Sequence, residues 1–336
     1  MQRVTRRHAL GTVAAVSSFG ILSGRAQAAE FTYKYANNQP LTHPMNIRAK
    51  EAADKIKEES NGRLEIQIFP NNALGGDTDM VSQVRSGAID FFTVSGLLID
   101  SFVPVAAANG VGYAFKNYDQ VWAAMDGEFG AHIRANIAKS SVMAFDKIWD
   151  NGFRQMTHGT RPINTPADLK GFKIRIPVMA IETSLFTRLG AAPATVNIKE
   201  AYSALQTHLV DGQENPLAII ENWKFYEVQK YCSLTNHMWD GFWMLASAKT
   251  WSKLPADLQA IVTRNFNAAA TNQRADIRLL NDTLRTKLEE RGMVFNSPDP
   301  EPFRETLRTS GYYQEWKGKF GDEAWALLEK YSGKLA

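Results

Sequence analysis

The sequence predicts an α/β fold of two halves that are joined by a long helix. Short apolar strand patterns alternate with amphipathic helical patterns from residue 31 to residue 94, as in a parallel sheet with helical crossovers. A second series of the same kind begins near Gly152. A helical pattern from Pro255 to Arg291 would then extend about 55 Å at ~1.5 Å per residue, which exceeds the width of one domain.

The first half has the pattern βαβαβ. Its predicted elements are, in order, a strand at Phe31–Asn37, a helix from about Pro44 to Ser60, a strand at Leu64–Ile68, a helix at Thr78–Ser86 with Asp77 as its N-cap, and a strand at Ile89–Val94. Ligands of such sheets collect at the carboxyl ends of the strands. Those ends carry small or amide residues at 37–39, 71–72 and 95–96, which are equally well explained as turn formers.

The second half repeats this alternation. Before it, a helix is predicted around Tyr118–Ala138 and a strand at Val142–Ile148. From Gly152 on, the predicted elements are the strand FKIRIP at 172–177, a helix at Ala180–Leu189, a strand at Ala194–Asn197, a helix at Lys199–Val210, a strand-like passage at 239–251, the long helix, a strand at Met293–Asn296 and helix to Leu335.

Two arginines stand out in this half. Arg154 follows an aromatic-glycine-aromatic run, and Arg175 lies in FKIRIP, where alternation turns it away from Ile174 and Ile176. A guanidinium that is fixed on a strand suits two-pronged capture of a carboxylate. The residues alone leave open the alternative that both are surface arginines paired with nearby acids.

The composition is that of a globular protein. Of the 336 residues, 44% are hydrophobic and 22% are charged. Four of the 38 basic residues lie in residues 1–28, which contain no acid, so 34 Lys and Arg face 35 Asp and Glu in the remainder. A body so close to neutral gives no support for binding to nucleic acid or to an anionic membrane.

Residues 1–28 have the three parts of an export signal. A basic start is followed by an uncharged, weakly apolar run at 9–24 and by the small-x-small sequence Ala-Gln-Ala. The sequence TRRHAL at 5–10 resembles a twin-arginine signal, and the general secretory route is the alternative. Cys232 is the only cysteine, which excludes an intrachain disulfide. We therefore expect a mature chain of residues 29–336 in a bacterial periplasm.

No local motif of a zinc peptidase, serine hydrolase or nucleotide-binding enzyme occurs in the chain. The histidines outside the signal lack metal-ligand spacing, and the acids are spread along helical faces without an evident acid–base pair. We therefore predict a protein that is not an enzyme, that has no cofactor and that has no metal-ligating residues, while a metal-bridged ligand stays open.

Five segments carry a family resemblance: NGRLEIQIFPNNALGGD, VRSGAIDF, PADLKGFKIRIP, VDGQENP and TNHMWDGFWMLAS. Through them the chain resembles the solute-binding proteins of tripartite ATP-independent periplasmic (TRAP) transporters, in the four-carbon-dicarboxylate receptor class. The resemblance covers essentially the whole mature chain. It implies a two-lobed periplasmic binding protein fold, type II-like, whose lobes close over a ligand. It also implies small and large membrane subunits as partners.

The resemblance also gives lobe boundaries and site residues. Lobe I is expected at residues 29–150 plus about 240–280, and lobe II at 151–239 plus about 281–336, in a monomer. Arg175 matches the arginine that binds the ligand carboxylate, and Arg154 matches a second arginine that assists it. Further matches are Asn215 in DGQEN, Ser95 at the end of the third strand, and Asn38 or Gln39 after the first strand.

Four aromatic residues complete the candidate site: Trp149, Phe153, Trp239 and Phe242. Ser95 stands where sialic-acid receptors of this class carry an acid, which argues against an amino- or polyol-rich sugar acid. The aromatic residues favour an apolar or aromatic ligand body, such as an aromatic 2-oxo or 2-hydroxy acid or a branched hydroxy acid, and a plain dicarboxylate stays open. A periplasmic enzyme acting on an organic acid and a ligand-sensing subunit for a kinase are the alternatives to transport.

Overall fold

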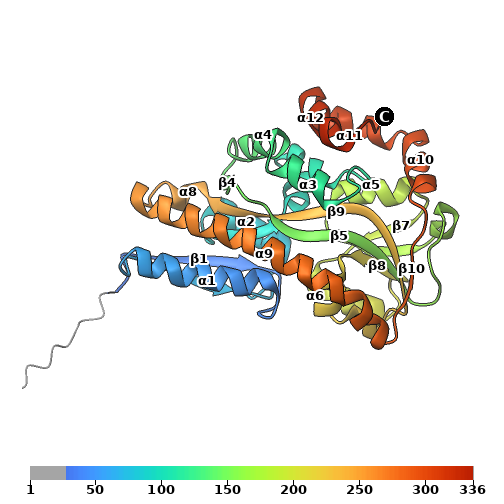
Figure 1. Cartoon of the computed structure of the whole chain (residues 1–336), viewed down its shortest axis with the longest axis horizontal. Coiled ribbons are helices and arrows are strands. Elements are labelled where there is room, and N and C mark those ends of the chain that lie inside the picture. Colours follow the sequence, from blue (N-terminus) through green and yellow to red (C-terminus); the bar gives the residue numbers. More distant parts are fainter. Residues whose placement is uncertain (1–27, 336) are drawn as a thin grey trace, which may run out of the picture.

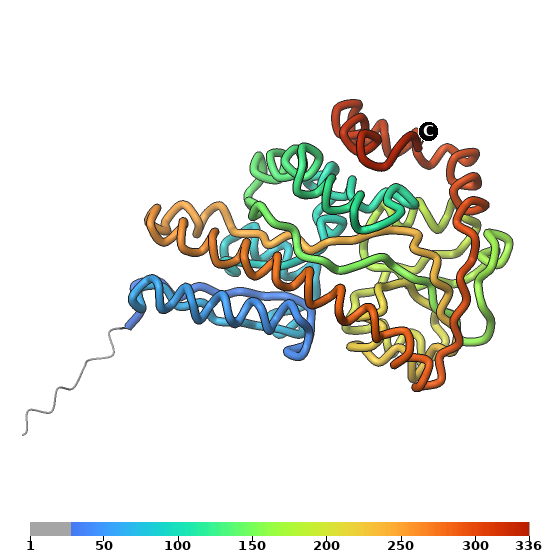
Figure 2. Tube along the Cα trace, viewed as in Figure 1, coloured from blue at the N-terminus to red at the C-terminus, as the bar shows by residue number. Residues whose placement is uncertain are grey.

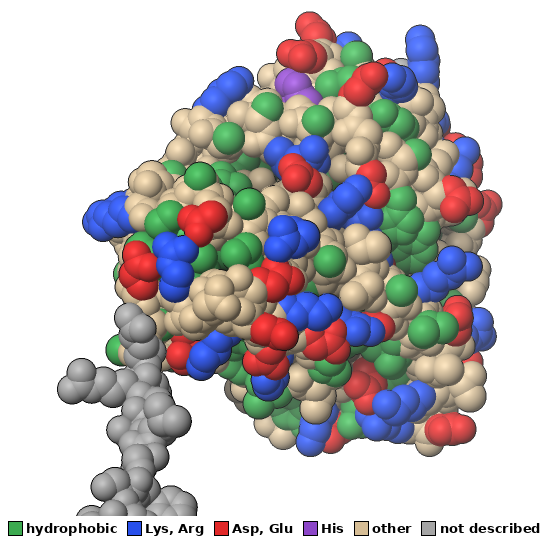
Figure 3. Space-filling view, turned by 60° about the vertical axis from the view of Figure 1, so that its left-hand side comes forward, with side chains coloured by type: hydrophobic (Ala, Val, Ile, Leu, Met, Phe, Trp, Pro, Cys, Tyr) green, Lys and Arg blue, Asp and Glu red, His purple; other side chains and the backbone are tan. Residues whose placement is uncertain are grey.

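The computed structural model describes residues 28–335. The predicted export signal therefore lies outside the described residues, apart from Ala28. Among the helices of the described part, none combines the length and the apolar character that crossing a membrane requires. Acidic and basic side chains are interspersed over the face drawn in Figure 3, in keeping with the near-neutral composition of the body.

The strands of the described residues form one mixed sheet (Figure 1). The strands are β1 (Phe31–Asn37), β2 (Leu64–Phe69), β3 (Phe91–Ser95), β4 (Val142–Ala144), β5 (Trp149–His158), β6 (Lys173–Ile176), β7 (Ala192–Thr195), β8 (Gly212–Asn215), β9 (Tyr231–Ser247) and β10 (Val294–Asn296). The order is β2-β1-β3-β9-β5-β8-β6-β7, and β4 and β10 also pair with β9.

The sheet has two parallel groups. β1 pairs in parallel with β2 and β3, and β6 pairs in parallel with β7 and β8. The antiparallel strands β9 and β5 join the first group to the second. The two halves expected from the sequence are therefore confirmed as two strand groups, and these two long strands connect them.

Helices cover both groups. They are α1 (Pro44–Glu59), α2 (Asp77–Ser86), α3 (Tyr118–Met125), α4 (Glu128–Ile137), α5 (Ala180–Arg188), α6 (Ile198–Gln206), α7 (Leu217–Asn222), α8 (Ala248–Trp251), α9 (Ala256–Glu290), α10 (Glu301–Thr309), α11 (Tyr312–Phe320) and α12 (Asp322–Ser332). Four 3₁₀ turns are η1 (Gly96–Ile99), η2 (Pro104–Gly110), η3 (Pro166–Leu169) and η4 (Phe225–Glu227).

The long helix is confirmed as α9, which has 35 residues. It contacts α1 of the first group, β5 at the junction and α7 of the second group. Figure 2 shows it running obliquely past all of them. The helix is thus a brace along both strand groups.

Several predicted boundaries are wrong. The strand-like passage at 239–251 ends at Ser247, because Ala248–Trp251 form α8. The helix expected at 118–138 is broken at Gly127, where an added Cβ would lie 2.5 Å from the carbonyl oxygen of Ala123. The strand expected at 142–148 ends at Ala144. Asp77 is the first residue of α2, and Gly76 is its N-cap. β9 begins at Tyr231 rather than at 239. Its first residues include polar side chains, which an apolar strand pattern does not detect, and they pair with β10 on one side and β5 on the other.

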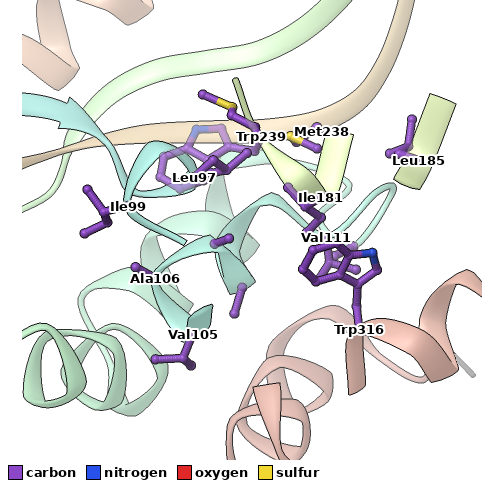
Figure 4. Close-up of a cluster of buried hydrophobic side chains, with 14 of the residues drawn as sticks. Leu97, Ile99, Val105, Ala106, Val111, Ile181, Leu185, Met238, Trp239 and Trp316 are labelled. Carbon is purple, nitrogen blue, oxygen red and sulfur yellow. The ribbon is translucent and has the colours of Figure 1, made fainter. Parts of the chain in front are cut away.

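The largest core cluster combines side chains from both groups (Figure 4). It includes Leu97 beside β3, Ile181 and Leu185 of α5, Trp239 of β9 and Trp316 of α11. All five are at most 2% exposed. The C-terminal helices therefore pack into the core that the two strand groups share.

Candidate functional site

A small cavity of about 30 Å³ lies between the two strand groups. Most of its walls are polar and come from the ends of strands, where a parallel sheet presents its ligand site. The lining side chains are Asn38, Gln39, Asp77, Ser95, Leu98, Asn151, Arg154, Arg175, Pro177, Met179, Ile198, Asn215, Ile219, Asp240 and Phe242. The structure thus brings seven of the ten predicted site residues to one cavity.

Arg175, on β6, has a guanidinium that is only partly bonded. Its Nε and Nη2 both donate to the carbonyl oxygen of Val196, at 2.9 and 2.6 Å. Its Nη1 is buried without a hydrogen-bond partner, and the residue is 1% exposed. Burial lowers the pKa of Arg175 to about 10, an effect that the charge of Glu214 only partly opposes. A bound anion would pair with this buried cation and offset the desolvation cost of its charge.

Arg154, on β5, is in the opposite situation. Its Nε and Nη2 bind the two carboxylate oxygens of Glu214, the second at 2.6 Å. Its Nη1 donates to Oδ2 of Asp240 at 3.2 Å, and Nη2 also reaches Oδ1 of Asn215 at 3.3 Å. Burial acts to lower the pKa of Arg154, but the charges of Glu214 and Glu182 raise it overall. Arg154 is therefore neutralised by the protein itself.

Three fully buried acids surround Arg154: Glu182, Glu214 and Asp240. Burial, together with the charge of Glu214, raises the pKa of Glu182 well above its usual range. Arg154 overcomes the opposing effect of burial and lowers the pKa of Glu214, which stays ionised. The expectation that the acids are spread along helical faces is wrong for Glu214 and Asp240, which lie on β8 and β9.

His237, on β9, extends this network. Its Nε2 lies 3.2 Å from Oε2 of Glu214, and its Nδ1 lies 2.8 Å from the hydroxyl of Thr235. Burial lowers the pKa of His237, so the ring is neutral. An ionised Glu214 can only accept a hydrogen bond, so the ring proton of His237 lies on Nε2. The Nδ1 atom is then an acceptor, and the hydroxyl of Thr235 donates to it.

The side chains of the first group form a hydrogen-bonded wall opposite Arg175. Asn38 donates to both oxygens of Asp77, at 3.0 and 3.2 Å, and Gln39 donates to Asn38 at 2.7 Å. Burial raises the pKa of Asp77 to about 6. Asn151 of β5 donates to Asp240 at 2.9 Å. The oxygens Oε1 of Gln39 and Oδ1 of Asn151 are buried and unpartnered, so two free acceptors border the cavity.

Ser95 and Asn215 are held by protein partners. The hydroxyl of Ser95 donates to Oδ1 of Asp240 at 2.8 Å. The amide of Asn215 donates to Oε1 of Gln213 at 2.6 Å, and its oxygen faces Arg154. Both side chains are therefore fixed in position before any ligand enters.

Of the four predicted aromatic residues, only Phe242 lines the cavity. Trp149 is buried in the core of the first group. Trp239 donates to Asp150 at 3.1 Å, and Phe153 packs edge-on against Tyr118 at 5.3 Å. β5 has register shifts between Asp150 and Gly152 and again after Arg154, so simple alternation does not predict which of its side chains share a face.

Eight lining residues were not predicted as site residues, and three of them are polar: Asp77, Asn151 and Asp240. Asp240 lies in the segment MWDGF of a long strand, and its inward position depends on the pairing of β9 with β5. Asn151 faces the cavity from the register shift in β5. The one usable signal was a charged residue within an aromatic strand, which implies a buried partner.

The family described as bacterial extracellular solute-binding protein, family 7, matches residues 35–317 of the chain. The chain belongs to this family. It is 31% identical over 307 residues to a solute-binding protein of Roseobacter denitrificans, covering 90% of this chain and 92% of the relative. It is also 31% identical over 274 residues to the sialic acid-binding periplasmic protein of Vibrio cholerae, covering 81% and 84%.

Solved structures of TRAP periplasmic solute-binding proteins share the fold. One from a Polaromonas species, bound to D-erythronate, has a TM-score of 0.86 at 27% identity and covers 90% of this chain and 100% of its own. One from Sulfurospirillum deleyianum, with bound succinate, has a TM-score of 0.84 at 28% identity and covers 91% and 99%. The two-lobed α/β fold is thus that of a TRAP solute-binding protein, a receptor for organic acids that works with a membrane transporter and is not an enzyme.

Proposed function

We propose that this chain binds a small hydroxylated carboxylate in the cavity beneath Arg175. A monomer in the periplasm would then deliver the ligand to the small and large membrane subunits of a TRAP transporter. The observation that carries the proposal is the contrast between the two arginines: Arg154 is saturated by protein carboxylates, whereas Arg175 keeps a buried Nη1 with no partner. An anion in the cavity satisfies that donor and neutralises the charge.

Arg175 is the anchor in this proposal. A ligand carboxylate would accept from Nη1 of Arg175, and the low dielectric of the enclosed cavity would strengthen the pair. Asn215 would contribute its amide to the same carboxylate. Arg154 would act indirectly, because it fixes Asn215 and Asp240 through hydrogen bonds of 3.3 and 3.2 Å.

The two unpartnered amide oxygens in the cavity are the reason for proposing hydroxyl groups on the ligand. Gln39 and Asn151 each present a buried oxygen without a donor, and a hydroxyl is the donor that a neutral amide oxygen accepts best in such a place. Only one of the aromatic residues behind the expectation of an apolar ligand body lines the cavity, namely Phe242. Ser95 stands where sialic-acid receptors carry an acid, but Ser95 donates a hydrogen bond to Asp240. Asp240 therefore supplies a carboxylate close to that position.

The ligands of similar proteins support a hydroxy acid. The Polaromonas protein was solved with D-erythronate, and a Roseobacter denitrificans protein that is 28% identical to this chain was solved with L-galactonate.

A thermal-shift screen tests the ligand class, since a ligand that binds only the folded protein raises its stability by mass action. The screen would compare four- to six-carbon hydroxy acids with dicarboxylates and aromatic 2-oxo acids. We expect the hydroxy acids to give the largest increases in melting temperature. A larger shift with an aromatic acid would overturn the proposed ligand class.

Isothermal titration calorimetry of Arg175→Ala tests the anchor with the best acid of the screen. Truncating the cation of a desolvated pair should cost on the order of 2–5 kcal/mol of binding free energy. Arg161→Ala is the matched control, because Arg161 is a half-exposed surface arginine 3.6 Å from Asp168. Affinity within a few-fold of wild type for Arg175→Ala would place the carboxylate elsewhere.

A further inference from the structure

A second cavity, of about 470 Å³, adjoins the ligand cavity where η1 of the first group faces α5 of the second. We call it the outer cavity. Its walls include exposed side chains such as Val178, which is 42% exposed. Leu98 of η1 and Met179, just before α5, line both the outer cavity and the ligand cavity. These two apolar side chains therefore form the partition between the ligand cavity and the outside.

A hydrogen bond crosses between the two groups beside this partition. The backbone N–H of Ala180, the first residue of α5, donates to Oδ2 of Asp100 at 3.1 Å. Asp100 directly follows η1, two residues after Leu98, and Ala180 directly follows Met179. The bond thus joins the two segments that carry the partition. Leu97 and Ile99 of η1 and Ile181 of α5 belong to the same buried cluster (Figure 4).

The start of α5 has no cap of its own. Its N-cap residue is Met179, whose side chain cannot accept a hydrogen bond from the helix. The first N–H groups of a helix need acceptors, and a carboxylate there also interacts favourably with the helix dipole. Asp100 supplies that acceptor from the opposite strand group. The capping of α5 therefore depends on the two groups being together.

We infer that Asp100 is a latch that holds the partition of Leu98 and Met179 closed and so sets the rate of ligand release. This inference rests on the proposed function, because it concerns a ligand held in the cavity behind the partition. When the groups separate, the N–H of Ala180 loses Asp100 and returns to water. The latch therefore stabilises the closed state alone and contacts no ligand.

The kinetic test compares dissociation rates by stopped-flow tryptophan fluorescence, with D-erythronate as the probe. Loss of a helix cap by Asp100→Ala should speed dissociation roughly tenfold and leave the association rate nearly unchanged. Asp100→Asn keeps a side-chain acceptor and should recover most of the slow release. Ser101→Ala, in the same wall of the outer cavity, is the matched control. Equal dissociation rates for wild type and Asp100→Ala overturn the latch.

A ligand-free measurement separates failure of the latch from failure of the proposed function. The only cysteine, Cys232, is fully buried, so an added pair of exposed cysteines can be labelled with fluorophores. Lys50→Cys on α1 and Thr207→Cys after α6 place one label on each strand group. Single-molecule energy transfer then gives the closed fraction without ligand.

We expect Asp100→Ala to lower the ligand-free closed fraction, Asp100→Asn to restore it, and the melting temperature to stay at the wild-type value. If no acid of the screen raises the melting temperature of the wild type, the proposed function fails. The ligand-free closed fraction then tests the latch by itself. An unchanged closed fraction overturns it. A lower melting temperature for Asp100→Ala with an unchanged closed fraction assigns Asp100 a structural role.

Discussion

Two buried arginines lie in one cavity and differ in their partners. Arg154 has Glu214 and Asp240 within hydrogen-bond distance, whereas Arg175 forms no ion pair with any carboxylate of residues 28–335. Removing one member of a buried ion pair leaves the other charge uncompensated and lowers stability. Removing a buried charge that has no counter-charge eliminates its desolvation cost and raises stability. The two arginines should therefore respond to substitution in opposite ways.

Substitution by methionine tests this contrast in the ligand-free protein. We expect Arg154→Met to lower the free energy of unfolding by roughly 3–5 kcal/mol, because Glu214 and Asp240 lose their counter-charge. Arg175→Met should raise it by roughly 1–3 kcal/mol, in line with the pKa that burial lowers to about 10. Urea unfolding at constant pH measures both. A loss of stability in Arg175→Met comparable to that in Arg154→Met would contradict the assignment.

At this scale the sequence predicts which residues matter better than what they do. Arg154 and Arg175 are both identifiable from their segments, and both line the cavity. Their difference depends on Glu214, Asp240 and the carbonyl of Val196, which approach from other strands and leave no local pattern. Aromatic residues such as Trp149 carry even less information, because a pocket and a core select the same side chains.

Among the elements, β5 is fixed at the point where it passes from one strand group to the other. Gln273 of α9 is fully buried, accepts from the N–H of Asp150 at 2.9 Å and donates to its carbonyl at 2.7 Å. These two hydrogen bonds of the side-chain amide satisfy both backbone groups of Asp150, next to the register shift that leaves Asn151 without a partner in β9. It positions Asn151, which faces the ligand cavity, and it buries the carboxyl of Asp150.

Asp150 should make stability fall as pH rises. Burial raises its pKa to about 7, against the hydrogen bonds from Trp239 and Tyr118 and the charge of Arg274 that lower it, while the charge of Asp240 adds to the increase. Between its ordinary pKa, about 3.9, and 7, the folded state holds a proton that the unfolded state has lost. The contribution of Asp150 is therefore retained at low pH and lost between about pH 4 and 7, by at most about 1.4 kcal/mol per pH unit.

Asp150→Asn isolates that contribution, since the amide oxygen still accepts from the indole of Trp239. Urea unfolding of both proteins from pH 5 to pH 7.5 should show the variant gaining stability over wild type as pH rises, on the order of 1–3 kcal/mol at pH 7.5. Acids that do not interact with Asp150 titrate equally in both proteins and cancel in the difference. Parallel stability curves would mean that Asp150 is ionised throughout this range.

Periodicity in the sequence predicts the elements whose apolar pattern is regular. It does not predict elements whose extent is set by contacts between distant segments. The helix α9 and the strand β6 match their predictions because one period runs through each. The start of β9 was missed since Ser233, Thr235 and His237 are polar, and they are buried only through partners on other elements. Polar side chains in a strand hide it from an apolar pattern.

For the molecule as a whole, sheet and core are continuous across the two strand groups. β9 and β5 pair with each other along most of their length, and each also pairs with one of the parallel groups. The main core cluster joins Phe92 and Val94 of β3 to Ile174 of β6 and Leu185 of α5. The lobe boundaries at residues 150 and 239, and again near 280, stay a prediction, because the two groups share these strands and this core.

A shared core predicts that the two groups unfold together. Neither group keeps a complete core when the other is lost, because the side chains of the main cluster would face water and forfeit about 25 cal/mol for each Å² of apolar surface. Equilibrium urea unfolding should therefore give coincident transitions by far-ultraviolet circular dichroism and tryptophan fluorescence. Pulsed hydrogen exchange should give equal midpoints for peptides from β2 in the first group and from α6 in the second. Separate midpoints would mean that each lobe is stabilised by its own smaller cluster, around Phe91 in the first group and Phe225 in the second, and that the shared core is weak.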